Sequence, residues 1–162
     1  MSDVVNPYGA DLGALDAREA LRQTPEAIRG LCARMTPRDY ARATAPGKWS
    51  VSEILLHLAH VEVIFQSRLR FALSTPGYVV QPFDQDNFMR VEPPADGPAA
   101  LEAYTALRRL SRPLIDGLTA EQLEGRFTHP DFGELSVGWL LAWCAGHERR
   151  HLGQIEQIAA AL

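Results

Sequence analysis

The sequence predicts an all-α fold, a four-helix bundle with one long crossover between its second and third helices. Apolar residues recur at spacings of three and four along most of the chain, whereas the period-two alternation of strands is nearly absent. One connection, residues 74–97, is too long for a tight hairpin between antiparallel helices. The chain has 162 residues, of which 46% are hydrophobic, so we expect one domain with one core over residues 1–162.

The first helix is expected from Asp11 to Met35. Pro25 lies inside this range and should kink or interrupt the helix, because proline lacks a backbone N–H and its ring clashes with the preceding turn. The apolar residues that we expect in the core from this helix are Leu12, Leu15, Leu21, Ile28, Leu31 and Cys32.

The second helix has a strongly marked beginning in the stretch KWSVSEILLHL. Ser50 followed by Glu53 predicts a capping box, and Trp49 can pack on Ile54 across the first turn. The helix should end near Ser74, before a Pro-Gly pair. The other positions that we expect to face inward are His57, Val61, Ile64 or Phe65, Arg68 and Phe71. A histidine therefore stands among the expected core positions.

The long connection, residues 74–97, can return along the whole bundle. The second and third helices should then be parallel, which gives an up-down-down-up arrangement. The third helix follows Pro98, whose fixed φ suits a first helical turn, and Pro113 should bend or break this helix near its end. The fourth helix is expected to begin at Ser136 and to run nearly to the C-terminus.

Composition and charge exclude several classes of partner. Acidic residues outnumber Lys and Arg by 20 to 16, and the formal charge of -4 has the wrong sign for binding a phosphate backbone, so we expect no nucleic-acid partner. No stretch approaches the ~18 uninterrupted apolar residues of a membrane span, and no secretory signal is evident. Cys32 and Cys144 form no CxxC pair, which is typical of a reducing compartment. We therefore expect a cytoplasmic protein with no membrane partner.

The stretch GHERRHLGQIEQI places His147 and His151 four residues apart, on one face of a helix. Neutral imidazole binds zinc, nickel, iron or copper at ~2.0–2.1 Å, although such a pair is equally compatible with exposed or separately hydrogen-bonded rings. His57 favours the metal, because antiparallel packing of the second and fourth helices brings it to the same level. The sequence therefore predicts a divalent-metal site formed by His57, His147 and His151.

Other side chains compete for places in this site. His60 lies one turn from His57 and is an alternative ligand, but it falls outside the inward-facing stripe of the second helix. Cys144 lies one turn before His147 and could donate a thiolate or simply pack in the core. His129 is expected in a loop.

The polar residues that could orient the ligand rings are Glu62, Glu148 and Gln154, each within about a turn of a histidine. We interpret the charged run at residues 148–150 as a solvent-exposed helix face rather than a substrate clamp. The three tryptophans are interpreted as core or helix-start residues; they are Trp49, Trp139 and Trp143.

The segments PGKWSVSEILLHLAHVE and GHERRHLGQI, separated by a long loop, together resemble the DinB-like superfamily of metal-binding four-helix bundles, damage-inducible proteins distinct from the DNA polymerase of that name. The resemblance extends from about Thr24 to Ile158. By position, it implies that the family's three metal ligands correspond to the three histidines of the predicted site. The chain departs from the family at His60, where an acidic residue is frequent, and at Glu148, where Asp is common.

Members of this family that are characterised as enzymes are metal-dependent thiol transferases or isomerases that use bacillithiol, mycothiol or a related thiol. The resemblance therefore implies a metal-dependent enzyme. We expect a divalent ion, zinc or nickel or else iron or manganese, that activates a low-molecular-weight thiol or water for attack on a small electrophilic substrate, in the manner of a thiol S-transferase or a hydrolase.

The alternative is a non-catalytic, dimeric metal-binding protein of the stress response, because the sequence shows no acid, base or nucleophile apart from the histidines. The resemblance also implies a homodimer. Apolar residues outside the inward-facing stripe of the second helix are available as contacts between the subunits; they are Leu55, Leu56 and Leu58.

Overall fold

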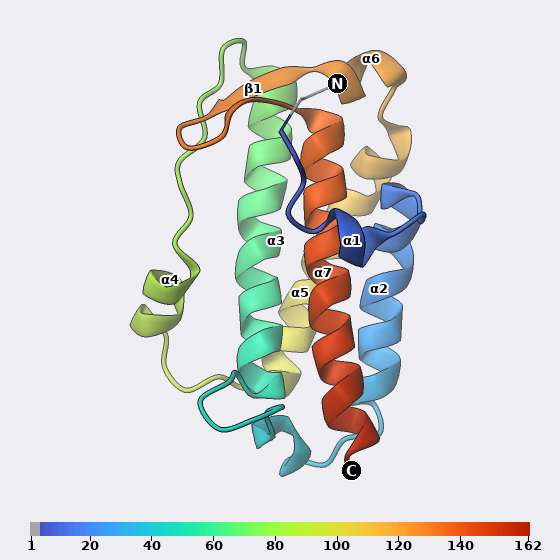
Figure 1. Ribbon diagram of the computed structural model, residues 1–162, viewed down its shortest axis with the longest axis vertical. Coiled ribbons are helices and arrows are strands. Elements are labelled where there is room, and N and C mark those ends of the chain that lie inside the picture. Colours follow the sequence, from blue (N-terminus) through green and yellow to red (C-terminus); the bar gives the residue numbers. More distant parts are fainter. Residues whose placement is uncertain (1–3) are drawn as a thin grey trace.

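A computed structural model describes residues 4–162 and shows four long helices packed along one another (Figure 1). They are α2 (Ala17–Cys32), α3 (Val51–Ser74), α5 (Gly97–Gly117) and α7 (Val137–Ala160). The prediction of a helical bundle is confirmed. The shorter elements are α1 (Gly9–Leu12), the 3₁₀ helix η1 (Asp39–Ala41), α4 (Gln85–Val91), α6 (Ala120–Glu124), β1 (Arg126–His129) and β2 (Gly133–Ser136). No helix in the described part of the chain combines the length and apolar character needed to cross a membrane.

Two helices begin where the capping signals predict. The Ser50 hydroxyl accepts from the backbone N–H of Glu53, at 3.3 Å, and the Glu53 carboxylate accepts from the Ser50 N–H, at 2.7 Å, which completes a capping box at the start of α3. The Ser136 hydroxyl accepts from the Trp139 N–H, at 3.0 Å, at the start of α7. Both caps fix the positions of residues further along these helices.

The predicted first helix, Asp11–Met35, is wrong in its first third. After the single turn of α1 the chain passes through Gly13, whose φ of 62° lies in the left-handed region that favours glycine. A new helix then begins behind Asp16, whose carboxylate accepts from the second and third backbone N–H groups of α2. Neither Pro25 nor Pro113 interrupts its helix, because α2 and α5 continue past these residues.

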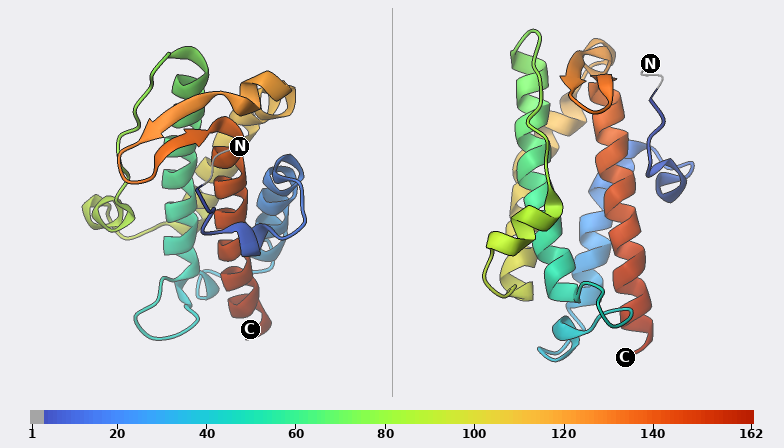
Figure 2. Two further views of the ribbon diagram at one scale, coloured as in Figure 1. Left: turned by 45° about the horizontal axis from the view of Figure 1, so that its top comes forward. Right: turned by 60° about the vertical axis from the view of Figure 1, so that its left-hand side comes forward.

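Helices α3 and α5 lie side by side and run in the same direction (Figure 1). At their first turns, Gly97 of α5 lies against the Ser52 side chain, and half-way along, the Gln66 amide donates to the Leu107 carbonyl, at 2.6 Å. Residues 75–96, which include α4, connect the end of α3 to the start of α5 and run back along the length of α3 (Figure 2). Helix α7 runs opposite to α3, so its second half lies beside the first half of α3.

A two-stranded antiparallel hairpin, β1 and β2, crosses one end of the bundle (Figure 2). The crossover segment pairs with it, because the Val80 N–H donates to the Thr128 carbonyl, at 2.9 Å. His129, predicted in a loop, is instead the last residue of β1 and is buried. Strands of four residues are too short to produce a visible alternation, which explains why the sequence shows no sign of them.

The apolar core consists of two clusters along the bundle axis. The cluster nearer the hairpin includes Phe65 and Leu69 of α3, and the second includes Leu55 and Leu58. Leu55 and Leu58 are at most 1% exposed, so the prediction that they contact a second subunit is wrong. Because α5 and α7 cover α3 from two sides, apolar residues outside its predicted stripe are buried as well. Phe71, predicted to face inward, is 51% exposed in the last turn of α3.

A buried ion cluster connects all four helices. Arg108 of α5 binds Glu62 of α3, at 2.5 Å, as well as Glu148 of α7, and it donates to the Leu21 carbonyl of α2, at 2.9 Å. Both carboxylates are at most 1% exposed, so the predicted solvent-exposed face at residues 148–150 is wrong for Glu148. Burial, followed by the charge of Glu62, raises the pKa of Glu148 to about 7. One cation thus balances two acidic groups within the core.

Replacing Arg108 with Met should lower the free energy of unfolding by about 3–5 kcal/mol, because two carboxylates lose their buried partner. Urea denaturation at pH 8 measures the loss. The exposed Arg112 of the same helix provides a control, and Arg112→Met should change the free energy by less than about 0.5 kcal/mol. Adding Glu62→Gln and Glu148→Gln to Arg108→Met should recover most of the loss. A loss below about 1 kcal/mol for Arg108→Met would contradict this account of the core.

Candidate metal centre

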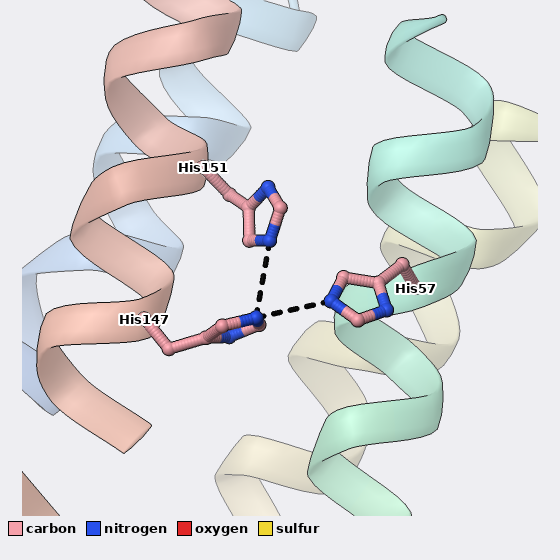
Figure 3. Close-up of side chains that lie close together, drawn as sticks. All are labelled: His57, His147 and His151. Atoms are coloured by element: carbon pink, nitrogen blue, oxygen red, sulfur yellow. Dashed lines mark hydrogen bonds between the residues drawn. The ribbon is translucent and has the colours of Figure 1, made fainter. Parts of the chain in front are cut away.

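Three histidine rings from two helices meet in the interior of the bundle (Figure 3). His57 lies in the first half of α3, and His147 and His151 lie on adjacent turns of α7. The Nε2 atom of His147 is 3.0 Å from Nε2 of His57 and 3.1 Å from Nε2 of His151. All three residues are buried, with exposed fractions of 1%, 3% and 7% in chain order. The structure therefore brings together the three histidines that the sequence predicts as a site.

The spacing of the three nitrogens suits a shared divalent ion. Two imidazole ligands at ~2.0–2.1 Å from one ion, with an angle of ~90–110° between them, lie ~2.9–3.4 Å apart. The two Nε2 separations from His147 fall in this range. Hydrogen bonding alone fits less well, because Nε2 of His147 faces two other ring nitrogens and a neutral ring has one donor and one acceptor. The cluster could hold a metal through three neutral nitrogens.

A hydrogen bond orients one ring, and aromatic side chains pack on the other two. Nδ1 of His151 lies 2.7 Å from the Gln154 side-chain oxygen, so Nδ1 carries the proton and Nε2 offers a lone pair to the cluster. The Trp143 ring stacks on His147 with centroids 5.2 Å apart and an angle of 5°, and the Trp49 ring lies 4.8 Å from His57. Nδ1 of His57 and of His147 has no hydrogen-bond partner among the described residues. Packing against indole rings therefore holds these two ligand candidates in place.

Burial keeps the three rings neutral. It is the main cause that lowers the pKa of His57 to about 3, and the neighbouring His151 and His60 lower that pKa further. Burial also lowers the pKa of His147 well below the ordinary value and lowers that of His151. Neutral rings have free lone pairs at pH 7, which is the state that metal ligation requires.

The two competing ligands lie outside the cluster. His60 points toward the crossover segment, where its Nε2 atom is 3.0 Å from a carboxylate oxygen of Glu92 and its ring packs on Phe88. Cys144 is fully buried beside the Arg108 cluster, and its sulfur lies 3.9 Å from Glu148. Burial raises the pKa of the Cys144 thiol well above its usual range, which disfavours a thiolate ligand.

Of the polar residues predicted to orient the rings, Gln154 contacts His151, whereas Glu62 and Glu148 bind Arg108. The three tryptophans pack against the apolar core, as predicted. Two of them, Trp49 and Trp143, contact the histidine rings directly. The immediate surroundings of the site are therefore mainly aromatic.

Sequence reasoning missed Tyr8, which packs against one side of the site. The Tyr8 ring lies 5.1 Å from the His147 ring, and the guanidinium of Arg150 lies 4.8 Å from the centroid of Tyr8. The Tyr8 backbone approaches α7 so closely that a Cβ atom on Gly146 would lie 2.3 Å from the Tyr8 carbonyl oxygen. Gly146, directly before His147, was the one sequence signal for such a close approach.

A cavity of about 790 Å³, which we call the main cavity, reaches His147 and His151 from the surface. Its wall is largely polar and charged. Apart from the two histidines, it is lined by side chains that include Tyr8, Asp11, Lys48, Trp49, Gln85, Asp86, Arg149, Arg150 and Gln154. The main cavity is large enough for a small molecule to reach the histidine cluster.

Comparisons with known proteins give consistent results. The sequence profile described as the DinB superfamily matches residues 20–155. A protein of Oceanobacillus iheyensis named "Putative metal-dependent hydrolase" is 27% identical over 75% of this chain and 71% of its own length. A Bacillus pumilus protein of the same name is 23% identical over 86% of this chain and 81% of its own.

Among solved structures, YfiT of Bacillus subtilis has the same fold as this chain. It is described as "a probable metal-dependent hydrolase with an unusual four-helix bundle topology". The alignment has a TM-score of 0.82 and covers 99% of this chain and 91% of YfiT, at 19% sequence identity. At this level of identity, the comparison establishes the shared bundle architecture.

Acid should destabilise the metal-free protein through these histidines. Because the pKa of each ring is lower in the folded protein than the ~6.5 of the unfolded chain, their contribution to stability is complete above pH ~6.5. That contribution falls as the pH drops toward the folded pKa, by up to ~1.4 kcal/mol per pH unit for each ring. Urea unfolding with a chelator present, at pH 7.5, 6.0 and 5.0, measures this slope.

The variant His57→Phe removes one titrating ring while it keeps an aromatic side chain in the core. It should reduce the acid-induced loss between pH 6.0 and 5.0 by up to ~1.4 kcal/mol relative to the wild type. Carboxylates titrate in both proteins, so their contribution cancels in the difference. Identical slopes for the two proteins would show that His57 is not a buried neutral ring.

Proposed function

This chain belongs to the DinB superfamily, and we propose that it is a metal-dependent hydrolase whose divalent ion is bound by His57, His147 and His151. The observation that carries the proposal is the convergence of three Nε2 atoms from two antiparallel helices, beside a cavity that His147 and His151 line. The names of the relatives support hydrolysis as the reaction. A small-molecule substrate is proposed because the main cavity measures about 790 Å³.

The donor set favours particular ions. Three neutral imidazoles without a carboxylate or thiolate suit borderline ions, so we propose zinc or nickel, and then iron or manganese. Three protein ligands leave coordination positions open, and a divalent ion bound there supplies a Lewis acid that activates water. The protein's own groups then position the substrate and limit access of bulk water.

Residues around the cluster have two proposed roles, which are to hold the ligand rings and to accept a proton. Trp49, Trp143 and Tyr8 pack against the ligand rings and hold them in position. Asp11 is held by Arg150, at 3.0 Å, whereas Asp86 lines the main cavity without an ion pair to any described residue. Asp86 is therefore the carboxylate that we propose to accept a proton during hydrolysis.

Thiol S-transfer is the second candidate reaction, and one observation favours it. The main cavity is lined by the cationic side chains of Lys48, Arg149 and Arg150, which suit an anionic co-substrate such as a thiol that carries carboxylates. Cys144 cannot serve as the nucleophile in its place, because it is buried beside Arg108. A non-catalytic metal-binding protein would have the same three ligands and no turnover.

Replacing any of the three histidines with Ala should reduce affinity for zinc or nickel by at least about 100-fold, because a ligand is lost and two nitrogens remain. Isothermal titration calorimetry of untagged protein measures the affinity. In thermal melts, a metal present at a hundredfold excess over its Kd should stabilise the wild type by about 2.7 kcal/mol, and the variants should lose this gain.

His60→Ala and His129→Ala are the matched controls and should keep the metal-induced gain in stability. Loss of the gain in His60→Ala, together with its retention in His57→Ala, would mean that the ligand set is displaced by one turn of α3. Tight stoichiometric binding by both His147→Ala and His151→Ala would rule out the three-histidine site.

Hydrolysis is tested with a panel of small p-nitrophenyl esters and amides, using metal-loaded protein, chelated protein and metal-loaded His147→Ala. The metal-loaded wild type should be faster than the other two by at least about tenfold. The same panel with cysteine or another small thiol distinguishes the reactions, since a thiol adduct among the products indicates S-transfer. Equal rates with and without metal for every substrate would contradict both enzymatic proposals and favour the non-catalytic alternative.

A further inference from the structure

A second, smaller cavity of about 290 Å³ shares Tyr8 with the main cavity as a lining residue. We call it the side cavity. Its walls are mostly aromatic, and its position under the β-hairpin follows from residues of β1, β2 and the first turns of α7 that line it. The aromatic rings are those of Tyr8, Phe83, Phe127, Phe132, Trp139 and Trp143. Such a wall favours a flat, apolar ligand.

One cation, Arg68, stands in this apolar wall. Its guanidinium donates to the Gln81 carbonyl, at 2.7 Å, and forms no ion pair with a carboxylate of residues 4–162. Burial lowers the pKa of Arg68, which reflects the energy cost of holding a charge among aromatic rings. An anionic ligand would offset that cost and would occupy the donors that the carbonyl leaves free.

His129 provides a second, neutral donor. Its Nδ1 atom accepts from the backbone N–H of Asp131, at 3.1 Å, so the ring proton resides on Nε2. Burial, and then the charge of Arg68, lower the pKa of His129, which keeps the ring neutral. The Asp131 carboxylate belongs to a side chain that is 71% exposed, and it lies 3.8 Å from His129. The Asp131 carboxylate also lines the side cavity, but it is largely exposed to solvent, so the half-buried Arg68 is the less exposed of the two charges there. His129 adds a neutral N–H.

We propose that the side cavity binds an aromatic carboxylate. The ring of such a ligand would pack against the aromatic wall, and its planar carboxylate would pair with the fork-shaped guanidinium of Arg68. The volume is near the lower end of ~300–1,000 Å³ for ligand sites, so a ligand of one or two rings fits. The role of Arg68 is then ligand recognition in addition to its contact with the crossover segment.

Aromatic rings connect the side cavity to the histidine cluster. Tyr8 borders both cavities, the Trp143 ring stacks on His147, and the Phe83 ring stacks on His57 with centroids 6.5 Å apart. A bound aromatic carboxylate would therefore touch the same rings that pack on the proposed metal ligands. Binding in the side cavity needs no metal, so the proposal stands whether or not the chain is a hydrolase.

The first test compares ligands on the wild-type full-length protein. Benzoate and 2-naphthoate are titrated against the matching amides and against acetate by isothermal titration calorimetry, with metal and again with a chelator. The carboxylates should bind at least about tenfold more tightly than the amides, because the amides lack the charge, and acetate should bind most weakly. Equal affinity for acid and amide, or no binding of either carboxylate up to millimolar concentration, would overturn the proposal.

The second test determines which cavity binds the ligand. Arg68→Met should weaken 2-naphthoate binding by at least about tenfold, and Arg68→Lys should retain part of the affinity since it keeps the charge without the fork. Lys48→Met, in the main cavity, and Arg70→Met, on the exposed side of α3, should leave the affinity unchanged. A greater loss in Lys48→Met than in Arg68→Lys would assign the ligand to the main cavity and overturn the proposal. Because the chelated protein is measured in parallel, failure here is separable from failure of the metal centre.

Discussion

Arg108 extends from α5 into the middle of the bundle, where its guanidinium binds carboxylates of α3 and α7 and a backbone carbonyl of α2. This contact also determines where the histidines meet. Glu62 lies five residues after His57 on α3, and Glu148 directly follows His147 on α7, so the helix register that pairs the charges also aligns the rings. A shift of α7 by one turn would leave a buried carboxylate without its cation, which costs several kcal/mol. The ion cluster thus excludes the alternative registers that would separate the proposed ligands.

Aromatic packing, rather than ion pairing, holds the rings of the histidine cluster. Buried rings with depressed pKa values are neutral, and they are packed by indole and phenol rings rather than held by carboxylates. The glycine before His147 lets the N-terminal segment close over α7, so Tyr8 becomes a partition between the main and side cavities. Tyr8 and Trp143, which pack on His147, also form part of the wall of the side cavity. A polar cavity lined by two of the histidines and an apolar cavity are therefore linked through the rings that pack on one cluster.

Local signals were sufficient to predict the features that depend on neighbouring residues. The capping box at Ser50 and the cap at Ser136 predicted the starts of α3 and α7, and helical spacing from these points selected His57 over His60 as the residue beside His147. Features set by contacts distant in sequence could not be predicted. No pattern within α5 indicates that Arg108 would pair with residues 46 and 40 positions away. The hairpin, the approach of Tyr8 and the burial of Glu148 likewise depend on packing between elements, which a single sequence does not display.

The central claim, a divalent ion bound by three imidazoles, is tested most directly by X-ray absorption spectroscopy. The sample is untagged protein loaded with one equivalent of zinc or nickel. The spectrum should show three imidazole nitrogens at ~2.0–2.1 Å, with further oxygen or nitrogen scatterers completing the shell and no sulfur. A sulfur scatterer at ~2.3 Å would place the ion at Cys144 with Glu62 and Glu148, the other group of side chains in the described chain that lie close enough to bind a metal. That result, or a shell with fewer than two imidazoles, would contradict the account.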